Sequence, residues 1–183
     1  DNKKLNKEFK IFKTKFDSKF LLANNFKIVT NYNNILYKKR LILSAMNLAF
    51  LGYFSSGKLY PHKNLYNWVD GIWAEKLTNT AKTPGRVLIN YLKIPKEIKT
   101  LLVIGNLSNL SKSYLFNKYN LKIINIKLPY GDIEKIIKTK IKIPKNSLIL
   151  ITLPTPKQEQ LAYHIAKTNK NFRIICIGAS IAL

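Results

Sequence analysis

Hydrophobic residues in the second half of the chain form four short runs, separated by stretches long enough for helices. The runs cover residues 100–104, 121–126, 147–153 and 172–177. All but 121–126 are almost continuously apolar, which is typical of strands buried on both faces of a sheet. Helices are predicted between the runs, at 107–119, 133–140 and 156–170. This alternation indicates βαβ units, so we predict an α/β fold: a Rossmann-like, mostly parallel sheet with helices on both faces.

The first half follows the same pattern less regularly. Residues 1–38 are rich in lysine with scattered apolar pairs, and are predicted to form a basic, loosely packed leader. The α/β domain is then expected to cover 39–183, with 98–183 as its regular βαβ half. In its less regular part we expect a strand at 40–44 and a helix at 47–54.

The net charge of the chain indicates which partners it attracts and says little about its fold. The chain has 32 Lys+Arg against 9 Asp+Glu, a formal charge of +23, and only three of the basic residues are arginine. Such a charge attracts phosphates, nucleic acid or an anionic membrane surface. Nucleic acid is the least favoured of these partners. Proteins that recognise DNA bases rely on bidentate contacts from arginine, which is scarce in this chain, and its aromatic residues are scattered. The 46% hydrophobic content excludes a disordered chain, and the single Cys176 excludes a disulfide scaffold.

Candidate chemistry is expected at the carboxyl ends of the strands, where open α/β sheets bind ligands. A Pro-Thr-Pro-Lys-Gln-Glu segment follows the third run there. Thr155 is placed to be an N-cap, Pro156 to be the first helical residue and Gln158 to complete a capping box. These roles leave Lys157 and Glu159 unexplained, and a helix N-terminus beside a lysine also suits a diphosphate. Helix capping and ligand binding both stay open for this loop.

Three other segments offer candidate site residues. Asp70 stands between two tryptophans, and it either caps a helix at 71–77 or, with its pKa raised by apolar neighbours, works as a general base. Asn47 is either a helix cap or a ligand contact. Lys82 and Arg86 flank a Thr-Pro-Gly helix start, where phosphate binding competes with plain capping.

Taken in this order, the segments resemble the WecG/TagA/CpsF glycosyltransferase family. Members carry an asparagine after an early strand, an Asp-Gly pair, a Pro-Gly-Arg element, and a Pro-Lys-Gln-Glu loop followed by a glycine-bearing strand. The matching positions in this chain are Asn47, Asp70-Gly71, Lys82–Arg86, Pro154–Glu159 and Gly178. The resemblance covers residues 40–183. Members usually continue into a C-terminal, arginine-bearing segment, and this chain is expected to lack it.

The resemblance implies an inverting, metal-independent glycosyltransferase of cell-envelope polysaccharide biosynthesis. It would move an N-acetylhexosamine-type sugar (N-acetylmannosamine or its uronic acid) from a UDP donor to a polyprenyl-diphosphate-linked sugar. Asp70 would be the general base and Asn47 would hold a sugar. Lys82 or Arg86 would offset the charge of the leaving diphosphate. Four further positions would line the donor pocket: Lys157, Gln158, Glu159 and Gly178.

The implied partners are the UDP-sugar, the lipid-linked acceptor and an anionic membrane surface. The protein is therefore expected in the cytoplasm, peripheral on the inner face of the cytoplasmic membrane, with no metal or other cofactor. The sequence does not set the oligomeric state, so a homo-oligomer stays open. Two alternatives also stay open: a basic nucleic-acid-binding module and a non-catalytic relative of the transferase.

Overall fold

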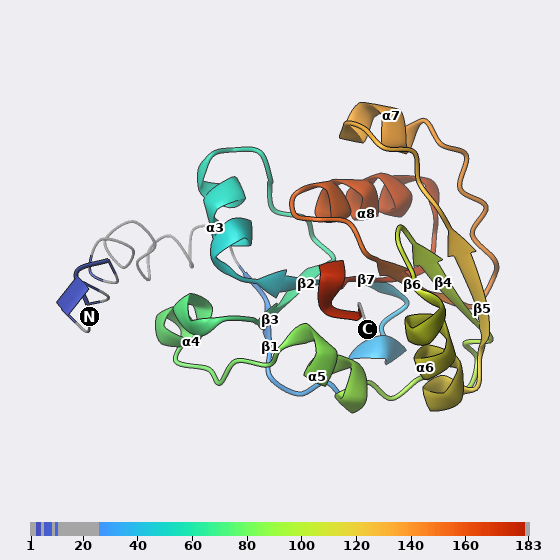
Figure 1. Ribbon diagram of the computed structural model, residues 1–183, viewed down its shortest axis with the longest axis horizontal. Coiled ribbons are helices and arrows are strands. Elements are labelled where there is room, and N and C mark those ends of the chain that lie inside the picture. Colours follow the sequence, from blue (N-terminus) through green and yellow to red (C-terminus); the bar gives the residue numbers. More distant parts are fainter. Residues whose placement is uncertain (1–2, 5, 9, 11–25, 182–183) are drawn as a thin grey trace.

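The computed structural model describes residues 3–4, 6–8, 10 and 26–181 (Figure 1). The strands are β1 (Ile28–Val29), β2 (Arg40–Met46), β3 (Leu65–Val69), β4 (Thr100–Ile104), β5 (Lys122–Ile126), β6 (Ser147–Ile151) and β7 (Phe172–Cys176). The helices are α3 (Leu48–Ser55), α4 (Ile72–Thr78), α5 (Gly85–Tyr91), α6 (Asn109–Tyr119), α7 (Ile133–Ile137) and α8 (Lys157–Thr168), with short 3-10 turns η1 (Ile35–Tyr37) and η2 (Gly178–Ile181).

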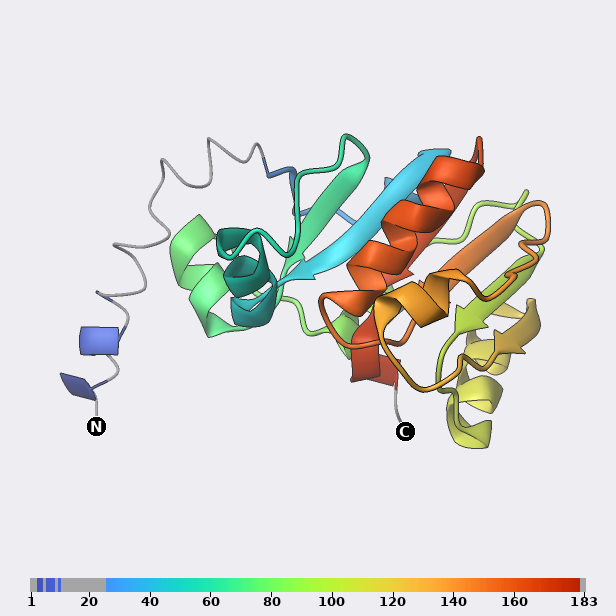
Figure 2. The ribbon, with the colours of Figure 1, turned by 90° about the horizontal axis from the view of Figure 1, so that it is seen from above.

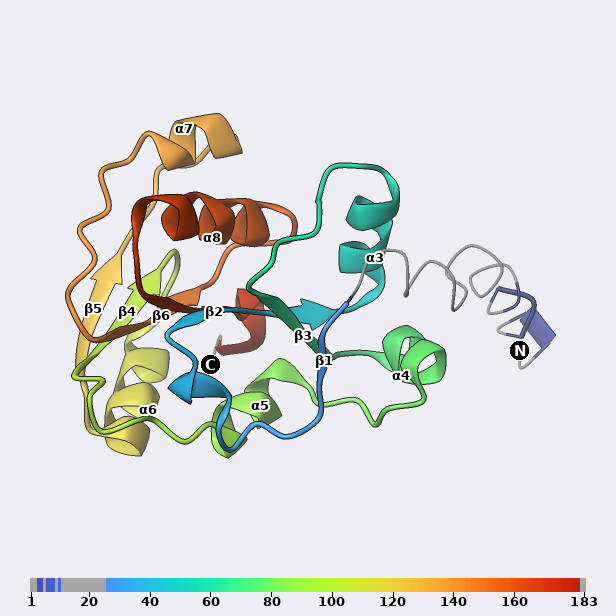
Figure 3. The same cartoon turned by 180° about the vertical axis from the view of Figure 1, so that it is seen from behind.

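The seven strands form one sheet in the order β1-β3-β2-β7-β6-β4-β5, and all neighbouring pairs are parallel. Helices α3, α7 and α8 cover one face, and α5 and α6 cover the other (Figures 1 and 3). The predicted Rossmann-like α/β fold is therefore confirmed. Among the described helices, none is both long and apolar enough to cross a bilayer.

Each face of the sheet carries its own hydrophobic core, because alternate residues of a strand point to opposite faces. In β2, Ile42 and Met46 pack in the core beneath α3 and α8, whereas Leu41 and Leu43 pack in the core beneath α5. The four central strands β2, β7, β6 and β4 are buried along almost their whole length. Each fully buried aliphatic side chain stabilises the fold by about 1.5–3 kcal/mol relative to an exposed one, so these strands anchor the sheet.

The end of the segment expected to be a loosely packed leader contributes to this body. Ile28 and Val29 pair with β3 at one edge of the sheet. Leu36 is fully buried and Ile35 nearly so, in the core on the α5 side. Residues 11–25 of the predicted leader lie outside the described residues, so the packing of its middle part stays a prediction.

Two strands were not expected from the sequence, β1 and β3. In β3 the polar Asn67 interrupts the apolar run Leu65–Val69, which hides the strand in a pattern search. Asn67 is completely buried. Its burial is tolerated because its Nδ2 donates a hydrogen bond to the carbonyl oxygen of Ser44 on β2 at 3.2 Å. The strand predicted at 40–44 continues to Met46, and the helix predicted at 47–54 is α3.

Candidate active site

The parallel sheet brings the predicted loops to one edge. From β3 to β4, its carboxyl ends carry Asp70, Asn47, Gly178, the segment 152–159 and Gly105, in that order across the sheet. Figure 2 shows the strands of this sheet from above. Segments that are far apart in the sequence are therefore neighbours at the position where such sheets bind ligands. The resulting edge is the candidate site.

Asn47 and Asp70 follow the adjacent strands β2 and β3. Asn47 is the N-cap of α3, and its Oδ1 accepts a hydrogen bond from Phe50 N at 3.0 Å. The capping role left open for Asn47 is thus confirmed. Its side chain also hydrogen-bonds the carboxylate of Asp70. The same asparagine therefore starts a helix and contacts the candidate base.

Asp70 is half-buried, and burial raises the pKa of its carboxyl group, while hydrogen bonds from Asn47 and from the Gly71 N–H partly counter the rise. Asp70 is not the cap of the helix that follows. That helix, α4, begins at Ile72 with Gly71 in the N-cap position at φ 85°, and no side chain caps it. The capping alternative for Asp70 is therefore wrong, because the glycine takes that position and leaves the carboxylate free for other contacts.

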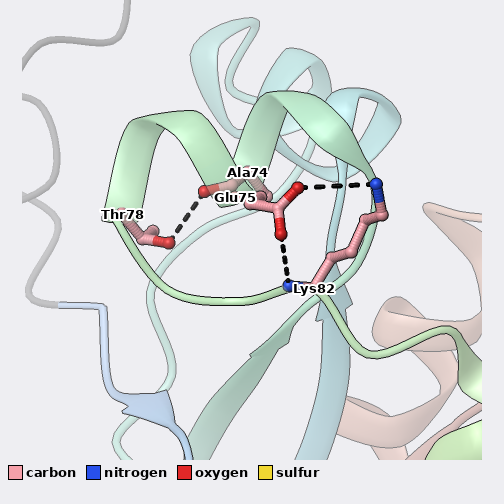
Figure 4. Close-up of polar contacts among 4 residues, drawn as sticks. All are labelled: Ala74, Glu75, Thr78 and Lys82. Atoms are coloured by element: carbon pink, nitrogen blue, oxygen red, sulfur yellow. Dashed lines mark hydrogen bonds and ion pairs between the residues drawn. The ribbon is translucent and has the colours of Figure 1, made fainter.

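Lys82 is held by the helix that follows Asp70. Its backbone N–H donates to Glu75 Oε1 at 3.1 Å, and its Nζ lies 3.4 Å from Glu75 Oε2 (Figure 4). In the same helix, Thr78 Oγ1 donates to the Ala74 carbonyl oxygen at 2.7 Å. The Lys82 side chain is about half exposed, so it is paired with a carboxylate and still reaches solvent.

Arg86 lies in the first turn of α5, on the surface. It borders an open, largely apolar hollow of about 310 Å³ together with Tyr114 and Ile181. The segment leading to it is fixed to the sheet edge, since Thr83 N donates to the Val69 carbonyl oxygen at 2.8 Å. Gly85 is buried against η2, where a Cβ atom at this position would lie 2.4 Å from Ser180 Oγ.

The loop between β6 and α8 starts its helix differently from the prediction. The helix begins at Lys157 with Pro156 in the N-cap position, and no side chain caps it. The predicted Thr155 cap and the capping box are therefore wrong. The Thr155 hydroxyl instead donates to Glu159 Oε1 at 3.3 Å and accepts from Gln158 Nε2 at 3.1 Å. Its oxygen thus serves a side-chain network rather than the helix backbone.

Gln158 links this loop to the end of β7. The Gly178 N–H donates to Gln158 Oε1 at 3.0 Å, and Gly178 has φ 57°, a conformation that favours glycine. Gln158 is 4% exposed and Glu159 is completely buried. Both side chains therefore lie beneath the surface of the edge and support its shape, while Lys157 lies nearer the surface.

Lys157 borders a hollow of about 230 Å³ at the ends of β4, β5 and β6. Its Nζ donates to the Gly131 carbonyl oxygen at 2.8 Å, which holds the ammonium group at the rim. Gly105 and Asn106 also line this hollow. Gly105 has φ 114°, and a Cβ atom there would lie 2.4 Å from Thr152 Oγ1, so the two strand ends can approach closely only at a glycine. The hollow can receive a polar, anionic group next to a fixed cation.

Two buried polar residues of this region were not singled out from the sequence. Ser44 and Asn67 face each other in register on β2 and β3, and both are completely buried. Ser44 Oγ donates to Glu159 Oε1 at 2.6 Å. Each is a polar residue inside an otherwise apolar strand, and that interruption was the available signal. Within residues 26–181 and the few described before them, no group of three or more His, Cys, Asp or Glu side chains could hold a metal ion.

A comparison with protein-family models finds no family that matches the chain, and a comparison with curated proteins finds no significant match. The assignment of a function therefore depends on the geometry of the site.

Proposed function

We propose that this protein is an inverting glycosyltransferase with Asp70 as its general base. It transfers an N-acetylhexosamine-type sugar from a UDP donor to a polyprenyl-diphosphate-linked sugar in cell-envelope polysaccharide biosynthesis. The observation that carries the proposal is the half-buried Asp70 carboxylate, with its raised pKa and its hydrogen bond to Asn47, at the carboxyl edge of the sheet. The order of the motifs along the chain, which resembles the WecG/TagA/CpsF family, supplies the reaction type.

The chemistry needs one base and a stabilised leaving group. Asp70 accepts the proton of the acceptor hydroxyl as its oxygen attacks the anomeric carbon of the donor. The bond from that carbon to the diphosphate oxygen breaks, and UDP leaves with the electron pair. A raised pKa suits this role, because a base is most effective when its pKa approaches the working pH.

Cations near the edge support departure of the diphosphate. Lys157 borders the hollow beside β6, and the segment that bears Lys82 and Arg86 is tied to the end of β3. Fixed positive groups stabilise the charge that develops on a leaving diphosphate. Lys157 is the best placed of the three, because its Nζ is oriented by a backbone carbonyl and lies at the rim of a hollow. The Lys82 ammonium group is already paired with Glu75.

The width of the edge is suited to the donor. Asp70 follows β3 and Lys157 follows β6, and these strands are three positions apart in the sheet. Neighbouring strands are spaced by about 4.8 Å, so this separation is roughly 14 Å along the edge. An extended nucleoside-diphosphate sugar can span such a distance with its nucleotide toward Lys157 and its sugar toward Asp70. Association with an anionic membrane at the inner face of the cytoplasmic membrane would bring the +23 protein to its lipid-linked acceptor.

Calorimetric titration with UDP and with UDP-N-acetylmannosamine tests the donor site. We expect saturable binding at about 0.15 M salt, where interactions between exposed charges are screened beyond roughly 8 Å. A single-stranded oligonucleotide is the control for unspecific attraction to a basic protein. Salt-sensitive oligonucleotide binding without any nucleotide-sugar binding would overturn the proposal and favour a nucleic-acid-binding module. Donor binding without UDP release in the presence of a lipid-diphosphate acceptor would favour a non-catalytic relative.

A further inference from the structure

The carboxyl group of Glu159 lies in the core, directly beneath the candidate site. Three donors converge on its Oε1 atom: Ser44 Oγ at 2.6 Å, Gln158 Nε2 at 3.0 Å and Thr155 Oγ1 at 3.3 Å. Its Oε2 atom is equally buried, yet it has no hydrogen-bond partner among the described residues. The two oxygens of one carboxyl group therefore have very different surroundings. An ionised carboxylate has two equivalent oxygens, and both would need donors.

Among the described residues, the groups that face Glu159 bring no positive charge. β2 contributes the Ser44 hydroxyl, β7 contributes the Cys176 thiol, and the next turn of α8 contributes the Tyr163 phenol. Burial raises the pKa of the Cys176 thiol well above its ordinary value and also raises the pKa of the Tyr163 phenol, so both are neutral. A carboxylate that is buried from solvent without a cation is strongly disfavoured, because hydrogen bonds to one of its oxygens compensate only part of its charge.

We infer that Glu159 is a protonated carboxylic acid in the native protein, with Oε1 as its carbonyl oxygen and the proton on Oε2. In this neutral form it is a positioning residue: it holds the Gln158 amide, whose Oε1 in turn receives the Gly178 N–H at 3.0 Å. The chain of contacts thus joins the start of α8 to the end of β7. The inference stands on this buried network and does not depend on the proposed transferase activity.

A second unsatisfied atom on the same face of the sheet agrees with this assignment. Asn67 lies beside Ser44 on β3, and its buried Oδ1 also has no donor among the described residues. Both unsatisfied atoms on this face are oxygens, so the cluster lacks hydrogen atoms rather than acceptors. A proton on Glu159 Oε2 leaves a neutral hydroxyl without a partner among the described residues, and a neutral group costs far less to bury than a charged oxygen. Burial also raises the pKa of the Glu159 carboxyl group, against the lowering effect of its hydrogen bonds.

The pH dependence of stability separates a neutral from an ionised Glu159. The unfolded chain releases this proton near pH 4.5, whereas the native protein retains it to higher pH. The native state then binds more protons than the unfolded state, so its stability falls as pH rises above 4.5 until the native carboxyl group ionises. Glu159→Gln is neutral and of the same shape, so its stability lacks this decrease with rising pH. We expect similar unfolding temperatures for the two proteins near pH 5, and an increasing advantage of Glu159→Gln toward pH 9.

The matched control is Glu134→Gln on α7, which removes one formal negative charge from an exposed position. It reports the general effect of raising the net charge of a protein that is already at +23. A difference between wild type and Glu159→Gln that is flat above pH 5, or that follows the Glu134→Gln control, would overturn the inference.

Carbon-13 NMR of the wild-type protein gives a second test that needs no variant. The Glu159 carboxyl resonance, assigned through its own side chain, should keep the shift of a protonated acid through pH 4.5. Exchange of the Gly178 amide hydrogen tests positioning: its protection should persist in Glu159→Gln and be lost in Glu159→Ala. An early titration of Glu159 contradicts its protonated state, and unchanged Gly178 protection in Glu159→Ala contradicts its positioning role.

Discussion

The side chain of Asn47 caps α3 with its Oδ1 atom and hydrogen-bonds the carboxylate of Asp70 at the end of the neighbouring strand. The Asp70 backbone N–H is fixed as well, since it donates to the Met46 carbonyl oxygen at 3.0 Å. The position of the candidate base therefore depends on the start of a helix and on the pairing of two parallel strands. Changes to either residue should affect both stability and chemistry, and the two effects can be measured separately.

Asp70→Asn should abolish turnover while the protein stays folded. The amide cannot accept the proton of the acceptor hydroxyl, so loss of general-base catalysis is expected to lower kcat by about 10²–10⁴-fold. UDP release in the presence of a lipid-diphosphate acceptor measures this effect, and donor affinity measured by calorimetry should change little. Asp132→Asn, at an exposed position before α7, is the matched control. Normal turnover by Asp70→Asn would remove Asp70 as the base.

The same Asp70→Asn variant should be at least as stable as the wild type at pH 7. The native pKa of Asp70 is raised above its ordinary 3.8, so the wild type loses stability as pH rises through the native pKa. The asparagine does not titrate and avoids this loss. Thermal unfolding between pH 4 and pH 8 should show the difference growing in favour of Asp70→Asn. A wild type that gains stability relative to Asp70→Asn over this range would contradict the raised pKa.

Asn47 variants should change the pH at which activity rises on the acidic side of the pH–activity profile. The Asn47 side chain lowers the pKa of Asp70, so its removal should shift the rise in activity to higher pH. Asn47→Ala should also lose its helix cap, at a cost of about 1 kcal/mol in the free energy of unfolding. Asn47→Ser keeps a capping oxygen but lacks the amide donor. We expect both variants to shift the pH profile and only Asn47→Ala to lose substantial stability in urea titrations; equal pH profiles in all three proteins would contradict the contact.

The regular half of the fold could be predicted because its strands are apolar and lie between helices of ordinary length. Strand β3 could not, since Asn67 breaks its pattern and is tolerated only through a contact with Ser44 on another strand. The sequence placed Asn47 just after a strand, but without β3 it could not indicate that Asp70 ends the neighbouring strand and meets Asn47 at the same edge. It could not indicate that Thr155 binds Glu159 instead of capping α8, because that contact depends on how the loop approaches the core. Pairings between segments distant in sequence were the information that a one-dimensional pattern lacks.

Gly85→Ala should destabilise the protein although alanine favours helices. A Cβ atom at this buried position would lie 2.4 Å from Ser180 Oγ and 2.7 Å from Ser180 Cβ, so η2 must move. Overpacking of this kind typically costs about 1–3 kcal/mol. Gly52→Ala in α3 is the matched control, because its exposed Cβ would meet nothing within 4 Å and should stabilise the helix by roughly 0.5–1 kcal/mol. Urea unfolding of both variants should give opposite signs, and a neutral Gly85→Ala would contradict the tight contact with η2.

Lys157 and Lys82 should contribute unequally to donor binding. The Lys157 ammonium group is held at the rim of the hollow by the Gly131 carbonyl oxygen, whereas the Lys82 ammonium group is paired with Glu75. A charged hydrogen bond to a phosphate contributes about 1.5–3 kcal/mol, so Lys157→Ala should weaken UDP binding roughly tenfold or more. Lys82→Ala should have a smaller effect, because the ion pair with Glu75 already offsets its charge. Calorimetric titration with UDP measures both, and Glu75→Gln is the control that releases Lys82 from its partner. Equal losses in the two lysine variants would indicate general attraction to a basic surface instead of a defined diphosphate contact at Lys157.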